Sequence, residues 1–204
     1  MTSPQDLFIV GLGNPGSEYA GTRHNLGWAC LDLLARRLNV GLDRKRWRSR
    51  VAQTQVDGRR VWLIEPQTFM NLSGQAVASA RRDLGVEGGI ENVWVVHDEL
   101  DLPLGRLRIK VGGSAAGHNG IRSVMSSLGS DAFVRFRVGV DKPPRPGAEA
   151  GIRWVLARFT PAEREIVERV THGVADALEM ALRDGVDQAM NVYNRSGSLG
   201  EGLP

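Results

Sequence analysis

Apolar and polar positions repeat with two different periods along the chain, and these periods alternate from one segment to the next. Unbroken apolar runs at 7–11 and 93–96 are typical of strands buried on both faces. Apolar residues spaced by three and four predict helices that begin after Asn25, near residue 74, near residue 120 and at Pro161. Shorter apolar or alternating segments predict further strands at 51–56, 61–65, 107–111 and 134–140.

Turn and capping residues separate these segments. Asp57-Gly58 stands between two alternating segments and therefore predicts a β-hairpin. Asn25 is expected to cap the first helix, because a side-chain oxygen there can accept a hydrogen bond from the first turn. Thr160 and Glu163 have the spacing of a capping box, which marks the start of a helix that Gly185 ends.

The order of these elements predicts the fold class. Strands that alternate with helices indicate an α/β protein, and the hairpin makes its sheet mixed rather than purely parallel. We therefore expect a twisted mixed β-sheet flanked by helices, in a single domain over 1–195. The proline-containing segment 141–151 is expected to be a mobile connector, and 196–204 a flexible C-terminal tail.

Composition narrows the class of protein. The chain has 204 residues, of which 42% are hydrophobic and 24% charged, as in ordinary globular domains. No apolar stretch approaches the roughly 20 residues that span a bilayer, and the start of the chain does not resemble a signal peptide. The single cysteine, Cys30, lies on the apolar face of the first helix and is expected to be a core residue. These features predict a cytoplasmic protein that is not bound to a membrane.

Positive charge is concentrated in one segment. The net charge is only +3, yet residues 36–60 contain nine Arg and Lys side chains and two acidic ones. Such a concentration on a nearly neutral body suggests a polyanionic partner such as RNA. A solvated surface unrelated to binding is the alternative, and composition alone leaves both open.

The first loop carries a weak match to a dinucleotide-binding motif. Gly11, Gly13 and Gly16 have the required spacing. However, Pro15 stands where backbone N–H groups should bind the pyrophosphate, and the nearest acidic residue, Asp32, lies within a helix. A nucleotide-dependent oxidoreductase therefore remains only as an alternative, which a test of NAD(P) binding would decide. A serine hydrolase or P-loop motif does not occur in the sequence.

A histidine and a carboxylate follow strand segments and are suited to acid–base chemistry. His24 lies in the loop before the first helix, and Asp98 follows the central strand. A carboxylate bound to one imidazole nitrogen fixes the tautomer and makes the other nitrogen a better base. Asn14, Asn71 and Asn119 also lie in loops after strands, where their amides can stabilise an oxyanion or bind a substrate carbonyl.

Histidines and acidic residues at these loops also raise the question of a metal site. The candidates are His24, His97, Asp98, Asp101 and His118. They come from three separate loops, and they lack the helical spacing or cysteine partners of common metal sites. We therefore expect neither a metal nor another cofactor.

Four motifs together resemble the bacterial peptidyl-tRNA hydrolase family. They are Ile-Val-Gly-Leu-Gly-Asn-Pro-Gly with Thr-Arg-His-Asn-Leu-Gly inside 7–28, Thr-Phe-Met-Asn-Leu-Ser-Gly at 68–74, Val-His-Asp-Glu-Leu-Asp-Leu-Pro at 96–103 and Gly-His-Asn-Gly at 117–120. They occur in the family's order and with similar spacing, and the resemblance covers about 5–195. It implies hydrolysis of the ester that joins a peptide to the 3′ ribose of tRNA.

The resemblance also implies roles for individual residues. His24 would be the base that activates water, Asp98 would hold it in the basic form, and Asn14 would help to distinguish N-blocked from free aminoacyl-tRNA. Positions that contact the substrate would be Tyr19, Phe69, Asn71 and Asn119. Arg108 and Lys110 would meet tRNA phosphates. The implied partner is peptidyl-tRNA, bound through its acceptor stem and 3′ end by a monomer without a metal.

The chain departs from the family pattern at two loops. Ala115 and Ala116 precede Gly117 where a second glycine is common, and Asp141 replaces a residue that is often small. Neither change touches the expected catalytic pair, so they affect loop mobility rather than activity. An RNA-binding module without catalysis is the second alternative, and it would have no use for His24 beside Asp98.

Overall fold

A computed structural model describes residues 6–86, 89–145, 147–195 and 199. Its centre is a seven-stranded sheet in the order β2-β3-β4-β1-β5-β7-β6. The strands are β1 (Leu7–Gly11), β2 (Arg44–Arg46), β3 (Ser49–Val56), β4 (Arg59–Pro66), β5 (Val93–Glu99), β6 (Leu107–Val111) and β7 (Val134–Gly139). The central pairs of β1 with β4 and β5, and of β5 with β7, are parallel, whereas β2, β3 and β6 pair antiparallel. The predicted mixed sheet and the Asp57-Gly58 hairpin are thus confirmed.

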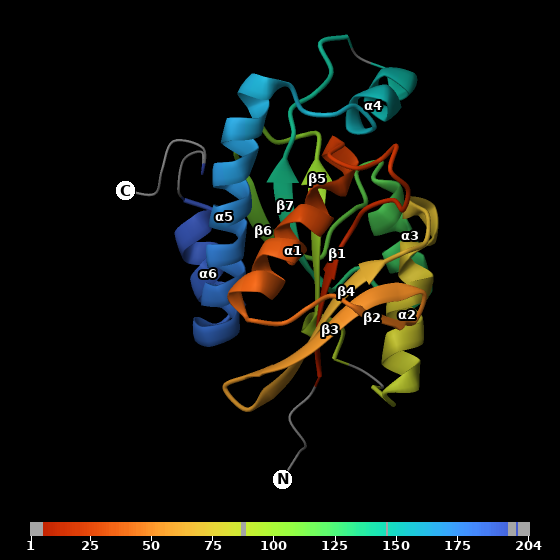
Figure 1. Ribbon diagram of the computed structural model, residues 1–204, viewed down its shortest axis with the longest axis vertical. Helices are drawn as coiled ribbons and strands as arrows, with labels where there is room; N and C mark the ends of the chain where they lie inside the picture. Colours follow the sequence, from red (N-terminus) through yellow and green to blue (C-terminus); the bar gives the residue numbers. More distant parts are fainter. Residues whose placement is uncertain (1–5, 87–88, 146, 196–198, 200–204) are drawn as a thin grey trace.

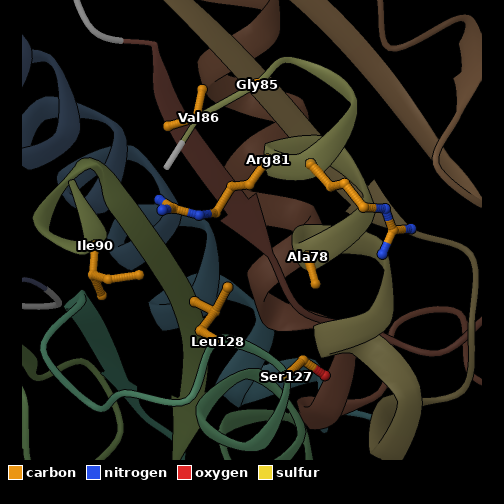
Figure 2. A pocket seen from close by; sticks show the side chains of 8 residues that line it. Ala78, Arg81, Gly85, Val86, Ile90, Ser127 and Leu128 are labelled. Carbon is orange, nitrogen blue, oxygen red and sulfur yellow. The ribbon is translucent and has the colours of Figure 1, made fainter. Parts of the chain in front are cut away.

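Helices cover both faces of the sheet (Figure 1). One face is covered by α1 (Leu26–Arg37), α5 (Pro161–Asp184) and α6 (Val186–Tyr193), and the other by α2 (Ser73–Asp83) and α3 (Asn119–Leu128). Between the C-terminal parts of α2 and α3 lies a cavity (Figure 2). The remaining elements are α4 (Ala148–Val155) and the short 3-10 helices η1 (Arg23–Asn25), η2 (Met70–Leu72) and η3 (Ile90–Asn92). Figure 1 shows α4 beyond the arrowheads of β5 and β7, at the carboxyl ends of the parallel strands.

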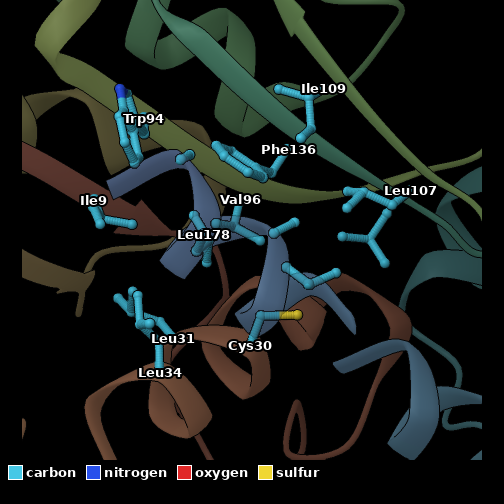
Figure 3. Close-up of a cluster of buried hydrophobic side chains, with 14 of the residues drawn as sticks. Ile9, Cys30, Leu31, Leu34, Trp94, Val96, Leu107, Ile109, Phe136 and Leu178 are labelled. Atoms are coloured by element: carbon cyan, nitrogen blue, oxygen red, sulfur yellow. The ribbon is translucent and has the colours of Figure 1, made fainter. Parts of the chain in front are cut away.

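Alternation along the buried strands divides the core into two layers. Leu7 and Ile9 of β1 pack toward α1 and α5, whereas Phe8 and Val10 pack toward α2 and α3. Because both faces are covered, every residue of β1 is buried. Cys30 lies in the first layer beneath Leu178 (Figure 3), and burial raises the pKa of its thiol to about 12. It is the buried core residue that the sequence predicted.

Helix α1 approaches the backbone of β1 too closely for side chains at the contact. A Cβ on Gly11 would lie 2.5 Å from the carbonyl oxygen of Gly27, and a Cβ on Gly13 would lie 2.7 Å from the ring of Trp28. Two glycines of the apparent dinucleotide motif therefore serve helix–strand packing. The space over them is filled by α1, which removes the geometric basis for the oxidoreductase alternative.

Several elements differ from the sequence prediction. The edge strand β2 and the helix α6 were not predicted, and the expected connector 141–151 turns into α4 at Ala148. The predicted tail falls outside the described residues except at Leu199, whose side chain is buried and whose N–H donates to the carbonyl of Gly105 at 2.8 Å. Within the described part of the chain, no helix combines the length and apolar character that a membrane crossing requires.

The end of the described chain also protects one sheet edge. Directly after α6, the side chain of Asn194 accepts a hydrogen bond from the N–H of Ile109 at 2.8 Å and donates to its carbonyl at 2.9 Å. Ile109 lies at the middle of β6, the outermost strand. Asn194 therefore satisfies the two backbone groups of Ile109, which would otherwise face solvent.

Candidate active site

Two cavities can be compared for the chemistry that they offer. The cavity between α2 and α3 is lined by Arg81, Arg82 and Ser127 among apolar side chains, and its described lining includes no histidine or carboxylate (Figure 2). A second cavity, of about 410 Å³, lies at the end of β5 and beside α4. Its lining includes His24 and Asp98, so it is the candidate active site. Ligands commonly bind at this edge of an open α/β sheet.

His24 and Asp98 form a direct hydrogen-bonded pair. Nδ1 of His24 lies 2.9 Å from Oδ1 and 3.0 Å from Oδ2 of Asp98. Asp98 is almost completely buried, and although burial alone would raise its pKa, His24 and His118 hold that pKa far below the usual range. Burial tends to lower the pKa of His24, but the charge and the hydrogen bond of Asp98 outweigh it and raise the pKa. The arrangement fixes the Nδ1–H tautomer and leaves Nε2 as the basic nitrogen.

The neighbouring residue Arg23 anchors the short helix η1 that carries His24. Its guanidinium lies 4.0 Å from the ring centroid of Trp154 and donates to the carbonyl of Arg158 at 2.9 Å. The same group forms an ion pair with Glu163 at 2.7 Å. Because Glu163 also completes the predicted capping box of α5, the start of that helix helps to fix the position of η1.

His118 is a third member of the site, and the sequence suggested it only as a possible metal ligand. Its Nε2 lies 2.9 Å from Oδ1 of Asp98, so this carboxylate joins two imidazole rings. The Gly-His-Asn-Gly motif before α3 was the signal that pointed to it.

The side chains of His24, Asp98 and His118 offer ligand atoms within 4.8 Å of one another. However, Nδ1 of His118 accepts hydrogen bonds from the N–H groups of Gly120 and Ile121, so the ring hydrogen is on Nε2. A nitrogen that carries a hydrogen has no lone pair for a metal. The hydrogen bonding of these side chains therefore fits an acid–base site better than a metal centre.

Asn14 is held in place by another asparagine, Asn25, which directly follows His24 in the chain. The side chain of Asn25 accepts from the N–H of Asn14 and donates to its carbonyl, both at 2.9 Å. Asn25 precedes α1 but makes no side-chain capping bond, so the capping role predicted for it is wrong. Oδ1 of Asn14 accepts from the N–H of Met70 at 2.7 Å, which orients the amide. No described residue accepts from its Nδ2, and this group remains available as a donor.

The other candidate substrate residues lie around the same region. Asn119 is exposed, begins α3 and lines the cavity with His24. Asn71 is exposed in η2, next to Met70. Phe69 is 55% exposed, and its ring meets that of Tyr19 edge to face at a centroid distance of 6.4 Å. An exposed aromatic pair of this kind offers a surface on which a base or an apolar group can stack.

Arg108 and Lys110 project from the edge strand β6 on the side opposite its buried residues. They stand directly opposite Arg137 and Arg135 of β7, which creates a face with four basic side chains. Arg137 is paired with Glu99 at 2.9 Å, and Arg135 donates to the carbonyls of Ser114 and Gly113. No described acidic residue forms an ion pair with Arg108 or Lys110, so both can meet an anion. Glu99, the partner of Arg137, also lines the cavity, so one residue is shared between this face and the site.

The basic segment 36–60 includes β2 and β3, at the edge of the sheet opposite β6, and part of its charge is neutralised internally. Three of its arginines form ion pairs, which are Arg37 with Asp176, Arg46 with Asp83 and Arg60 with Asp6. Arg50 donates a hydrogen bond to the buried carboxyl of Glu65 at 3.0 Å. Arg44 and Lys45 are exposed on the edge strand β2. The concentration of charge in this segment thus overstates the charge that it presents to a partner.

Comparisons with known proteins agree on one family. A peptidyl-tRNA hydrolase family model matches residues 8–199. A peptidyl-tRNA hydrolase of Chloroflexus aggregans is 45% identical over 186 residues, which are 91% of this chain and 97% of that protein. The corresponding enzyme of Roseiflexus castenholzii is 47% identical over 186 residues, which cover 91% of this chain and 86% of that protein. The crystal structure of peptidyl-tRNA hydrolase from Acinetobacter baumannii matches with a TM-score of 0.85 at 32% identity, over 96% of this chain and 97% of that one.

Proposed function

The chain belongs to the peptidyl-tRNA hydrolase family, and on that premise we propose that its cavity at the end of β5 uses His24 as the general base. The enzyme hydrolyses the ester bond between a peptide and tRNA. The observation that carries the assignment of the base is the buried pair of His24 and Asp98, with Nδ1 of the ring 2.9 Å from the carboxylate.

The geometry supports direct attack by water. Nε2 of His24 takes a proton from a water molecule as its oxygen adds to the ester carbonyl carbon. The resulting tetrahedral oxyanion collapses, and the proton on His24 passes to the 3′ oxygen of the ribose as the ester C–O bond breaks. The products are tRNA and the free peptide acid, whose new carboxyl group then releases its proton to solvent. A positioned general base of this kind typically contributes about 10²–10⁴-fold to the rate.

The oxyanion needs a donor, and we assign this role to Nδ2 of Asn14. Its amide is oriented because Oδ1 already accepts from Met70, and its backbone is fixed by Asn25, the neighbour of His24. Asn71 and Asn119 are exposed and would contact the remaining polar groups of the substrate. Loss of one preorganised donor typically costs about 10²–10³-fold in kcat.

The two ends of the substrate require different surroundings. Leu100, Ile152 and Val155 give the cavity an apolar wall suited to the acyl residue of the peptide. Phe69 and Tyr19 offer rings for the unpaired 3′ end, while Arg108 and Lys110 are placed to meet phosphates of the acceptor stem. We further propose that the chain acts as a monomer in the cytoplasm, because translation produces its substrate there; sedimentation would test the monomer.

The central test compares His24→Asn with the wild type on N-acetyl-aminoacyl-tRNA. We expect turnover to fall by about 10³-fold or more because the base is lost, while tRNA affinity stays within about twofold. Free aminoacyl-tRNA serves as the discriminating substrate, and His172→Asn on the exposed face of α5 serves as the matched variant. Retained turnover in His24→Asn, or an equal loss of affinity, would remove His24 from this role. A protein that binds tRNA but never cleaves the ester would instead be the RNA-binding module.

A further inference from the structure

His118 makes hydrogen bonds with both ring nitrogens, and the two bonds define its tautomer. Nδ1 accepts from the backbone N–H of Gly120 at 3.1 Å and of Ile121 at 3.2 Å, which makes His118 the N-cap of α3. A backbone N–H can only donate, so Nδ1 must carry a lone pair. The hydrogen of the neutral ring is therefore on Nε2, which donates to Oδ1 of Asp98 at 2.9 Å.

We propose that His118 is a positioning residue: capping of α3 keeps its ring neutral, and this ring shares the Asp98 carboxylate so that His24 alone takes up the proton from water. The proposal rests on the proposed function of His24 and assigns a separate task to the second ring. It explains why a site that needs one base contains two imidazoles on one carboxylate.

The helix explains why this ring stays neutral. A second ring hydrogen on Nδ1 would point at two N–H donors and break both capping bonds. It would also place a positive charge at the N-terminus of α3, where the helix dipole is already positive. His24 has no such constraint, because no described residue hydrogen-bonds to its Nε2. Of the two rings, only that of His24 can therefore take up an additional proton without loss of a hydrogen bond, and it does so at Nε2.

Charged and titratable groups from three elements surround His118, and the Asp98 carboxylate favours a protonated ring, whereas the N-terminus of α3 opposes it. From β5, the ring of His97 packs 4.8 Å away and is uncharged, since burial lowers its pKa well below the usual value. Asp98 and Glu99 are the acidic groups of that strand, and Glu99 is paired with Arg137. From β7, Arg135 binds the carbonyls of the loop that precedes His118. From α3, Arg122 is exposed and lines the same cavity.

Sharing of the carboxylate has a consequence for the base. Oδ1 of Asp98 accepts hydrogen bonds from both rings. The hydrogen bond from His118 stabilises the negative charge of the carboxylate and so weakens its interaction with His24. Without that second donor, Asp98 would stabilise the protonated form of His24 more strongly. The pKa of His24 would rise, and a smaller fraction of the enzyme would hold a neutral base at neutral pH.

Two substitutions separate the two hydrogen bonds of His118. In His118→Asn, the side-chain oxygen can replace Nδ1 as the cap but cannot reach Asp98. In His118→Gln, the longer amide can donate to Asp98 in place of Nε2 but cannot cap the helix at the same time. The readouts are the pH dependence of kcat/KM, KM for N-acetyl-aminoacyl-tRNA, and the thermal midpoint of unfolding.

For His118→Asn we expect an unchanged thermal midpoint and an acid limb of kcat/KM moved to higher pH by about half a unit to one unit. For His118→Gln we expect the wild-type acid limb with a lower thermal midpoint, because the cap is lost. Equal acid limbs in the wild type and both variants, or equal shifts in both variants, would overturn the proposal.

Nitrogen NMR of ¹⁵N-labelled histidine in the wild-type enzyme gives a direct answer even if a variant fails to fold. The expected result is a neutral Nε2–H tautomer for His118 across the whole range in which His24 titrates. Titration of His118 in the same range, or an Nδ1–H tautomer, would refute the proposal. Retained turnover in His24→Asn would instead refute the assignment of the base, so the two failures can be told apart.

Discussion

Individual side chains of the site could be predicted from sequence only where their role does not depend on which of their atoms faces a given partner. His24 and Asp98 were predicted because each follows a strand, and the structure places them in contact. The role of His118 could not be predicted, because it depends on which ring nitrogen faces the start of α3. Asn25 shows the opposite failure: its type and position favour a helix cap, but its side chain binds Asn14 instead.

A buried carboxyl on β4 predicts an unusual pH dependence of stability. Glu65 is fully buried, and burial together with Asp32 raises its pKa to about 8, although Arg50 donates to it at 3.0 Å. In the unfolded chain the pKa of the same group is about 4.3. Between these two values the folded state holds one more proton than the unfolded state, so the free energy of unfolding falls as pH rises.

Glu65→Gln should remove this dependence of the free energy of unfolding on pH. We expect the variant to match the wild type near pH 5 and to be the more stable protein at pH 9, as measured by urea unfolding at several pH values. Glu168→Gln on the exposed face of α5 is the matched control. Parallel stability curves for Glu65→Gln and the wild type would contradict the assignment of a protonated carboxyl.

At the scale of elements, the prediction succeeded where hydrophobic periodicity and turn residues agree. The strands of the sheet centre, the hairpin and the capped start of α5 were all predicted. The strand β2 was missed because Arg44–Arg46 is three exposed basic residues held only by pairing with β3. Helix α6 was missed because Gly185 correctly ends α5 but a new short helix begins directly after it.

The close approach of α1 to β5 and to the residue after β1 is an element contact that positions the site. A Cβ on Gly27 would lie 2.4 Å from the carbonyl oxygen of Val96 and 2.5 Å from the N of Leu12, which are backbone atoms that cannot move aside. We expect Gly27→Ala to cost about 3 kcal/mol of stability and to lower kcat, because α1 must shift and carry His24 away from Asp98. Thermal unfolding and single-turnover hydrolysis measure the two effects.

Gly151, in α4, provides the control for Gly27→Ala. A Cβ there meets only Leu100, at 3.7 Å, so Gly151→Ala should leave stability unchanged or slightly raised. If both variants were equally stable, the close approach of α1 to Val96 and Leu12 would not be the constraint that we describe.

At the scale of the whole molecule, sequence patterns do not show which charges neutralise one another. The excess charge of 36–60 attracted attention in the sequence, yet three of its arginines are paired with carboxylates from other segments of the chain. The basic face of β6 and β7 has fewer charges in sequence, but strand pairing brings them together. Its position follows from strand order, which local periodicity does not encode.

This difference predicts how salt should affect the two basic surfaces. Replacement of both Arg108 and Lys110 by serine should raise KM and reduce the slope of log affinity against log salt by about 2, because two phosphate contacts are lost. The same replacement of Arg44 and Lys45 changes the net charge equally but should have a much smaller effect. Equal effects of the two double variants would mean that net charge, rather than a local contact, governs tRNA binding.

Asn194 determines how β6 can be recognised. An outermost strand normally invites another chain to extend the sheet through its amides and carbonyls, and here that route is occupied at Ile109 by a residue from the end of the fold. A partner approaching this side therefore meets cationic side chains instead of an open backbone ladder. At Ile109 the outward-facing amide and carbonyl are therefore not available to extend the sheet, whereas the side chains of Arg108 and Lys110 on the same strand remain exposed.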